Sequence, residues 1–241
     1  MLHRLAAAML CGVGLGLLAA NGAAADTVDL ELVLLADASG SIDDGEIRFQ
    51  RQGYAEALTH PEVLAAIASG FAQRIAVTYV EWGDFTSQEI VVPWRIVDGA
   101  ASAQAFADEL LSVPRRARGP NAIGSAIAVG QALIEDNDLD GLRKVIDVSA
   151  DSAYSWGGVP LQEARRAALA AGIVINGLAI LCRERDCGGR PVSGDVEGAF
   201  ARQIIGGPAS FVVTADDGNS FAAAVRKKLI LEIAGEPGRP G

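Results

Sequence analysis

Asp37, Ser39 and Ser41 alternate with small residues directly after the apolar run at residues 32–36. That run predicts a buried strand, because both of its faces are hydrophobic. A carboxylate and two hydroxyls are oxygen ligands that a hard cation such as Mg²⁺ prefers, and we expect Gly40 to let the loop turn tightly. The alternative is a strand-to-helix turn in which Ser and Asp only cap the helix.

A second aspartate, Asp151, follows another apolar run at residues 144–150. If both runs are parallel strands of one sheet, Asp37 and Asp151 converge at the crevice outside the carboxyl ends of the strands. We interpret Asp147, in the middle of its strand, as a hydrogen-bonded structural group. Asp43 and Asp44 are interpreted as solvated capping residues at a helix start.

Strands alternate with helical patterns along the chain, which predicts an α/β fold with a doubly wound, mostly parallel sheet and helices on both faces. A short connection after residue 82 permits one antiparallel hairpin, and Pro93 indicates that its second strand lies on an edge. The predicted strands are 32–36, 75–82, 89–97, 144–150, 173–181 and 210–214, and the predicted helices are 43–59, 101–111, 122–136, 161–171, 195–205 and 217–233, with a further turn or two within 62–70.

The first 25 residues carry Arg4, then an apolar stretch, then Ala-Ala-Ala before Asp26. This order predicts a cleaved secretory signal peptide; an uncleaved membrane anchor is the alternative, but the Gly-broken core is short for a spanning helix. We therefore expect one domain at residues 26–234, a disordered tail at 235–241, and a secreted or periplasmic location.

The charge of the chain limits its partners. The full chain has a net charge of −10, and loss of Arg4 with the signal peptide leaves 19 basic against 30 acidic residues. Such an acidic chain is a poor binder of nucleic acid or of an anionic membrane surface. No later segment is long and apolar enough to span a bilayer, so we expect no membrane span after cleavage.

Cys182 and Cys187 are the cysteines that remain after cleavage. An exported protein meets an oxidising compartment, so a local disulfide between them is the favoured interpretation. Two cysteines alone make a poor zinc site, and His60 is the one histidine left in the mature chain.

The chain resembles the von Willebrand factor A (vWA) domain over roughly residues 28–234. The D-x-S-x-S loop matches the metal-ion-dependent adhesion site (MIDAS) of that family, which carries over to Asp37, Ser39 and Ser41. The family's later aspartate corresponds to Asp151. Its threonine ligand has no counterpart in residues 118–124, where Asn121 is the nearest replacement. The segment at residues 205–213 and the Lys-Lys-Leu helix after it also resemble an uncharacterised family of secreted vWA-like proteins.

The resemblance implies a Mg²⁺ site, or a Mn²⁺ or Ca²⁺ site, formed by Asp37, Ser39, Ser41, Asn121 and Asp151. It also implies a protein partner whose Asp or Glu carboxylate completes the coordination, so that the protein is a binding module and not an enzyme. Candidate partner contacts are Arg116, Arg118, Tyr154 and Trp156, which lie in the loops around the site; solvation of the arginines and packing of the aromatics onto a helix are the alternatives.

Two rival functions remain open from the sequence. A metal-dependent hydrolase would have to rely on carboxylates for acid–base work, since no G-x-S-x-G elbow, Cys-His pair or P-loop is visible. A metal-free structural scaffold is the other alternative, because the usual threonine is missing.

Overall fold

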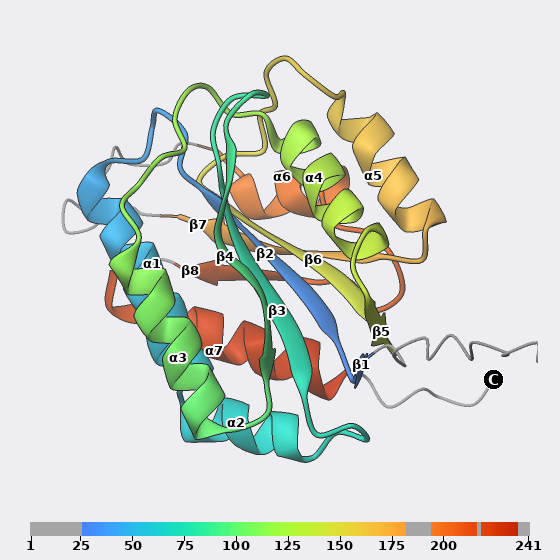
Figure 1. The fold of residues 1–241 in the computed structure, drawn as a ribbon. Coiled ribbons are helices and arrows are strands. Elements are labelled where there is room, and N and C mark those ends of the chain that lie inside the picture. Colours follow the sequence, from blue (N-terminus) through green and yellow to red (C-terminus); the bar gives the residue numbers. More distant parts are fainter. Residues whose placement is uncertain (1–25, 182–193, 216–217, 236–241) are drawn as a thin grey trace, which may run out of the picture.

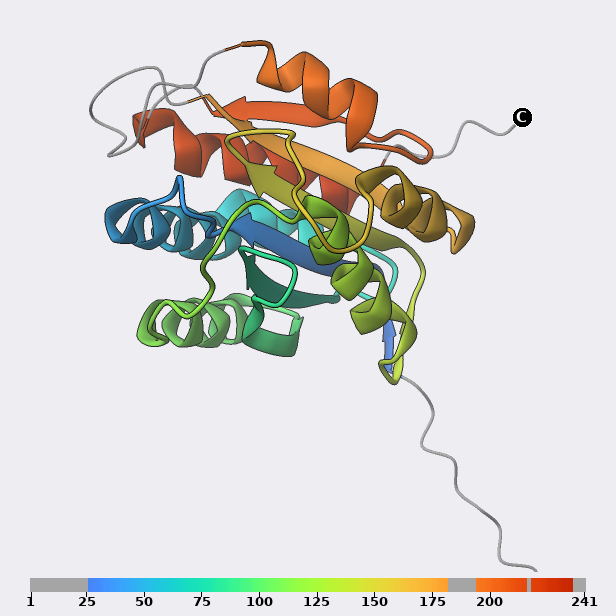
Figure 2. The same ribbon diagram turned by 90° about the horizontal axis from the view of Figure 1, so that it is seen from above.

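A computed structural model describes residues 26–181, 194–215 and 218–235. A central six-stranded sheet is covered by helices on both faces (Figures 1 and 2). The strands are β1 (Asp26–Val28), β2 (Glu31–Asp37), β3 (Ile75–Trp82), β4 (Gln88–Val97), β5 (Leu139–Gly141), β6 (Lys144–Ala150), β7 (Val174–Ile180) and β8 (Val212–Ala215). The helices are α1 (Asp44–Leu58), α2 (Pro61–Ala68), α3 (Ala100–Ser112), α4 (Ile123–Glu135), α5 (Leu161–Ala170), α6 (Val196–Gln203) and α7 (Gly218–Ala234).

The sheet has the strand order β4-β3-β2-β6-β7-β8, and every neighbouring pair is parallel except β3 with β4. The prediction of a mostly parallel, doubly wound sheet with one antiparallel edge strand is therefore confirmed. Pro93 lies in β4, the edge strand. Because proline has no backbone N–H, it is tolerated at an edge, where no hydrogen bond in the interior of the sheet is lost.

The apolar run of β2 is buried on both faces, as its composition predicts. Leu32 and Leu34 belong to the core beneath α1, α2, α3 and α7. Val33 and Leu35 alternate with them and pack with α4, α5 and α6 on the other face. A strand between two helical layers needs apolar residues at every position, which explains why β2 has no polar alternation.

A two-stranded parallel sheet of β1 and β5 was not predicted. Each of these strands has three residues, which is too short for a period-two pattern to be visible. Their pairing begins next to Glu31, whose buried carboxylate accepts hydrogen bonds from Gly141 N and Asn137 Nδ2.

The register places the predicted site. In β2 and β6, Ala36 lies opposite Ser149, so Asp37 and Asp151 both follow at the carboxyl edge of neighbouring strands. Backbone hydrogen bonds join further loops to the same edge: Gly40 N donates to Gly119 O at 2.8 Å, and Ala122 N donates to Gly83 O at 2.9 Å. The loops after β2, β3 and β6 and the connection from α3 to α4 thus meet at one end of the sheet.

Asp147 is part of a buried charged cluster beneath α7. Its carboxylate lies 2.5 Å from Nζ of Lys228, which also contacts Glu232 at 2.5 Å, and Tyr54 of α1 donates to Asp147 at 3.5 Å. Asn176 of β7 donates to Glu232 at 3.1 Å. The prediction of a structural role for Asp147 is confirmed, and its partners link α7 and α1 to the central strand.

Three predictions fall on residues outside the described ranges: the signal peptide at 1–25, most of the tail at 235–241, and the disulfide between Cys182 and Cys187. In the described part of the chain, each helix is too short or too polar to cross a membrane.

Candidate metal site at the carboxyl edge of the sheet

Asp37 is the centre of the predicted site and is fully buried. Its Oδ1 accepts a hydrogen bond from Ser39 N at 2.8 Å, while its Oδ2 has no hydrogen-bond partner among the described residues. Burial, followed by the nearby charge of Asp151, raises the pKa of Asp37 from 3.8 to about 7. A buried carboxylate oxygen without a partner is costly, so this group fits a site that a cation completes.

Ser39, Ser41 and Asp151 gather around Asp37. The hydroxyls of Ser39 and Ser41 lie 3.2 Å apart. Burial raises the pKa of Asp151, and a hydrogen bond from Ser41 acts in the opposite direction. The structure therefore brings together the four residues that the sequence placed on two distant loops, with two carboxylates and two hydroxyls at one place.

Asn121 contacts the loop of Asp151. Its Nδ2 donates to Oγ of Ser152 at 2.6 Å, and Trp156 N donates to its backbone carbonyl. With the amide nitrogen bound to Ser152, the amide oxygen is the atom that can serve as a cation ligand. Asn121 thus lies beside the aspartate with which it was expected to act.

Arg115 is a residue of this site that the sequence analysis did not single out from its solvated neighbours. Its guanidinium donates to the carbonyls of Ala38 at 2.7 Å and Ser39 at 3.2 Å, and it pairs with Asp44 at 3.0 Å. It fixes the loop of Asp37 from the outside and adds a positive charge that opposes the raised pKa of Asp37. No local motif marks such a contact, because the two segments are distant in sequence.

At the start of α1, Asp43 has the predicted capping role, whereas Asp44 pairs with Arg115 at 3.0 Å. Asp43 accepts hydrogen bonds from the backbone N–H of Gly45 and Glu46, and Glu46 accepts one from Asp43 N at 2.8 Å. Gly40 lies in a turn, as expected, but the turn does not require glycine. Gly40 is not among the residues with positive φ, and an added Cβ would meet only Gly119 O at 3.7 Å.

The candidate partner contacts surround this edge. Arg116 and Arg118 are exposed on the connection between α3 and α4. Tyr154 and Trp156 are exposed on the loop between β6 and α5, so packing of their rings against a helix, the alternative interpretation, does not bury them. Trp82, by contrast, is fully buried at the end of β3.

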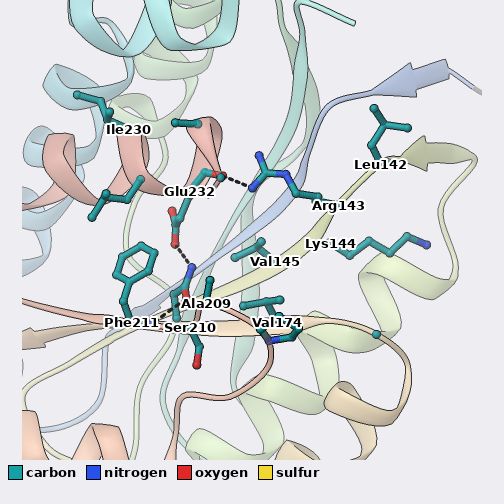
Figure 3. A pocket seen from close by; sticks show the side chains of 17 residues that line it. Leu142, Arg143, Lys144, Val145, Val174, Ala209, Ser210, Phe211, Ile230 and Glu232 are labelled. Carbon is teal, nitrogen blue, oxygen red and sulfur yellow. Dashed lines mark hydrogen bonds between the residues drawn. The ribbon is translucent and has the colours of Figure 1, made fainter. Parts of the chain in front are cut away.

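A cavity of about 810 Å³ lies away from this site, where the amino ends of β6 and β7 meet the last turn of α7 (Figure 3). Arg143 donates there to the backbone carbonyl of Glu232 at 2.7 Å. Val145, Val174 and Phe211 are among its apolar lining residues. Since none of the predicted site residues lines it, the cavity is separate from the carboxylate pair.

The donor set around Asp37 matches a hard divalent cation better than a soft one. No group of three or more His, Cys, Asp or Glu side chains placed for metal binding occurs in the described part of the chain. The donors gathered at this edge are two carboxylates with hydroxyl and amide oxygens, and Mg²⁺, Mn²⁺ and Ca²⁺ accept oxygen ligands of this kind.

Comparisons with known proteins give a family and a fold. The family model described as "Protein of unknown function (DUF1194)" matches residues 27–237. A search of curated proteins finds no match.

Solved structures with a similar fold include proximal thread matrix protein 1 from the mussel byssus with a zinc-occupied MIDAS motif, at a TM-score of 0.63, 16% identity, and coverage of 87% of this chain and 49% of that one. The pilus adhesin SpaC from Lactobacillus rhamnosus GG has a TM-score of 0.61, 14% identity, and coverage of 86% and 31%. A von Willebrand factor type A protein from Catenulispora acidiphila has a TM-score of 0.57, 14% identity, and coverage of 86% and 43%.

This chain spans about half or less of the length of these three proteins. Because the sequence identities are low, the matches establish similarity of fold alone. The family match, in contrast, covers most of the sequence. The chain belongs to the family of proteins of unknown function DUF1194, and it has the von Willebrand factor A fold.

Proposed function

We propose that this protein is an exported binding module that holds a divalent cation at Asp37, Ser39, Ser41, Asn121 and Asp151. The observation that carries the proposal is the buried carboxylate of Asp37, which has one oxygen without a hydrogen-bond partner among the described residues and lies near the half-buried carboxylate of Asp151. Two neighbouring carboxylates, one of them fully buried, repel each other when both are charged, and a cation between them removes that repulsion.

The bound cation would supply an open coordination position for the carboxylate of a partner protein. Two carboxylate ligands balance the formal charge of a divalent ion, and its remaining ligands are uncharged oxygens. The ion can therefore still attract the carboxylate of a partner. Ser39 and Ser41 contribute hydroxyls, while Arg115 holds the loop that carries them. The residues of the site thus bind and orient, and no histidine base lies among them to activate the serine hydroxyls, which favours binding over hydrolysis.

The solved structures of similar fold give independent support. They include a pilus adhesin and a matrix protein, and one of them has a MIDAS motif occupied by zinc. Those properties belong to the other proteins, and the similarity of fold supports a protein-interaction role for this chain without identifying its ion or partner.

Thermal unfolding tests the cation site. At a Mg²⁺ concentration of 100 times the Kd, the melting temperature of chelator-stripped wild type should rise by about 5 to 10 °C. Asp151→Ala should lose this shift, whereas Asp108→Ala, an exposed aspartate on α3, should keep it. An equal shift in wild type and Asp151→Ala would contradict the assignment of Asp151 as a ligand.

A further inference from the structure

Exposed aromatic side chains stand beside the proposed cation site on two different loops. Tyr154 and Trp156, on the loop between β6 and α5, are 74% and 66% exposed, and Phe85, on the loop between β3 and β4, is 56% exposed. Large aromatics are favoured as interface anchors because they cover much apolar area with little loss of side-chain freedom on binding. Their position at one edge of the sheet indicates a contact surface.

The loop that carries Tyr154 and Trp156 is firmly held. Gly124 N, at the start of α4, donates to Oγ of Ser155 at 3.1 Å, and Val159 N donates to Oγ of Ser125 at 3.1 Å. These contacts, with the bonds of Asn121 described above, fasten the loop to α4. The exposed aromatic rings are thus carried by a backbone that is already held in place. Binding to such a preorganised surface costs less conformational entropy.

Phe85 connects the two loops. Gly157 and Gly158 have φ values of +67° and +61°, and the space that their side chains would occupy is filled. A Cβ at Gly158 would lie 2.4 Å from Cβ of Phe85, and one at Gly157 would lie 3.1 Å from its ring. The close approach fixes the turn after Trp156 against the loop of Phe85, so the two loops that carry the aromatics lie side by side.

Positive charge borders the same edge. Arg116 and Arg118 are exposed on the segment whose Gly119 carbonyl accepts a hydrogen bond from Gly40 of the Asp37 loop. The whole chain has a net charge of −10, which repels an acidic partner at a distance. Two arginines beside the site give local charge complementarity to such a partner.

We propose that Phe85, Tyr154 and Trp156, with Arg116 and Arg118, bind an extended acidic segment of a partner protein in which a large apolar side chain flanks the carboxylate that reaches the cation. This inference rests on the proposed function and adds the chemistry of the partner. Many acidic ligands could offer a carboxylate to the cation, so the carboxylate alone gives little specificity. The neighbouring apolar side chain packs on the aromatic rings and distinguishes one acidic segment from another.

Defined peptides test the inference. Fluorescein-labelled Gly-Ser peptides carry one Glu, with or without one Leu at varied spacing, and are titrated with Mg²⁺-loaded protein by fluorescence polarisation. The best Glu-Leu peptide should bind at least about tenfold more tightly than the Glu-only peptide, and Tyr154→Ala with Trp156→Ala should remove that gain. Phe71→Ala, which changes an 88% exposed aromatic at the amino end of β3, should retain it.

The outcomes separate the inference from the function on which it rests. If wild type binds Mg²⁺ but no peptide, or if Leu gives no gain, or if the double variant keeps the gain, the inference is wrong and the cation site stands. If wild type does not bind Mg²⁺, both are wrong. Binding of an oligosaccharide probe with the same dependence on Trp156, in place of the Glu-Leu peptide, would also overturn the inference.

Discussion

At the scale of the residue, Asp37 is suited to a cation and unsuited to a structural role. Its unpartnered Oδ2 is buried at the end of β2, close to the charge of Asp151. Asp147 and Glu232 also have one buried oxygen without a partner, but both pair with Lys228, whereas Asp37 has no ion pair among the described residues. Asp37 is therefore best understood as a group that destabilises the metal-free protein in return for binding.

Replacing Asp37 by Asn should separate these two effects. In the presence of chelator, the free energy of unfolding of Asp37→Asn should be no more than about 1 kcal/mol below that of wild type. The amide oxygen can still accept a hydrogen bond from Ser39 N, and the substitution removes a buried charge. The same variant should lose stabilisation by Mg²⁺. Urea unfolding with and without Mg²⁺ measures both; a large loss of stability in chelator would show that Asp37 is structural.

The residues of the site were predictable from sequence to different extents. Asp37, Ser39 and Ser41 form a continuous motif at a strand end, and Asp151 follows a second strand, so strand order alone brought them together. Arg115 was missed because its contacts with the carbonyls of Ala38 and Ser39 depend on how two loops pack. The turn at Gly40 was predicted, but its backbone conformation does not require glycine, which the sequence alone did not reveal.

At the scale of the element, α7 is fixed to the sheet by a buried ion cluster. Lys228 lies within 2.5 Å of carboxylate oxygens of both Asp147 and Glu232, and all three side chains are almost fully buried. Such a cluster adds little net stability over an apolar equivalent, but removal of one member leaves charges without partners. The cluster therefore makes the position of α7 depend on a few side chains.

Lys228→Met should destabilise the protein by about 3 to 5 kcal/mol, because two buried carboxylates lose their cation. Lys227→Met, the neighbouring exposed lysine on the same helix, should change stability by no more than about 0.5 kcal/mol. Chemical unfolding of both variants measures the difference. Equal effects of the two substitutions would mean that the buried cluster has no special role.

The same cluster predicts a pH dependence. Burial raises the pKa of Asp147 to about 7, opposed by the charge of Lys228 and assisted by that of Glu232; Tyr54 of α1 also faces this carboxylate. An unfolded Asp has a pKa of about 3.9, so between about pH 4 and 7 the folded state binds more protons and stability falls as pH rises.

Asp147→Asn should remove this contribution, so its free energy of unfolding should fall less steeply than that of wild type over the same pH range. Urea unfolding in chelator at a series of pH values gives both slopes. Parallel curves for wild type and the variant would contradict a protonated Asp147 in the folded state.

The elements themselves were mostly predictable. The strand predicted at 75–82 and the one at 144–150 have the observed bounds of β3 and β6, because each is rich in Val, Ile and other residues that favour strands and lies between polar loops. Helix boundaries differ by one or two residues, as expected where capping decides the last turn. The β1–β5 pair could not be predicted, because its strands depend on tertiary contacts with Glu31 and not on a pattern of their own.

At the scale of the whole molecule, the fold keeps the proposed binding edge apart from the rest. Both site aspartates, the aromatics Phe85, Tyr154 and Trp156, and two exposed arginines lie at the carboxyl ends of the strands. The 810 Å³ cavity and the last turn of α7 lie at the amino ends of β6 and β7. Exposed aromatics and two exposed arginines at one edge of an acidic chain can orient a partner through that edge.

The central claim is that Asp37 and its neighbours bind a divalent cation, and calorimetric titration of chelator-stripped protein with Mg²⁺ and Mn²⁺ tests it most directly. Wild type should bind one ion, and Asp37→Ala should show no binding while its circular dichroism spectrum is unchanged. Retained binding by a folded Asp37→Ala would contradict the assigned site. Absence of binding by wild type would contradict the claim itself and favour a metal-free scaffold.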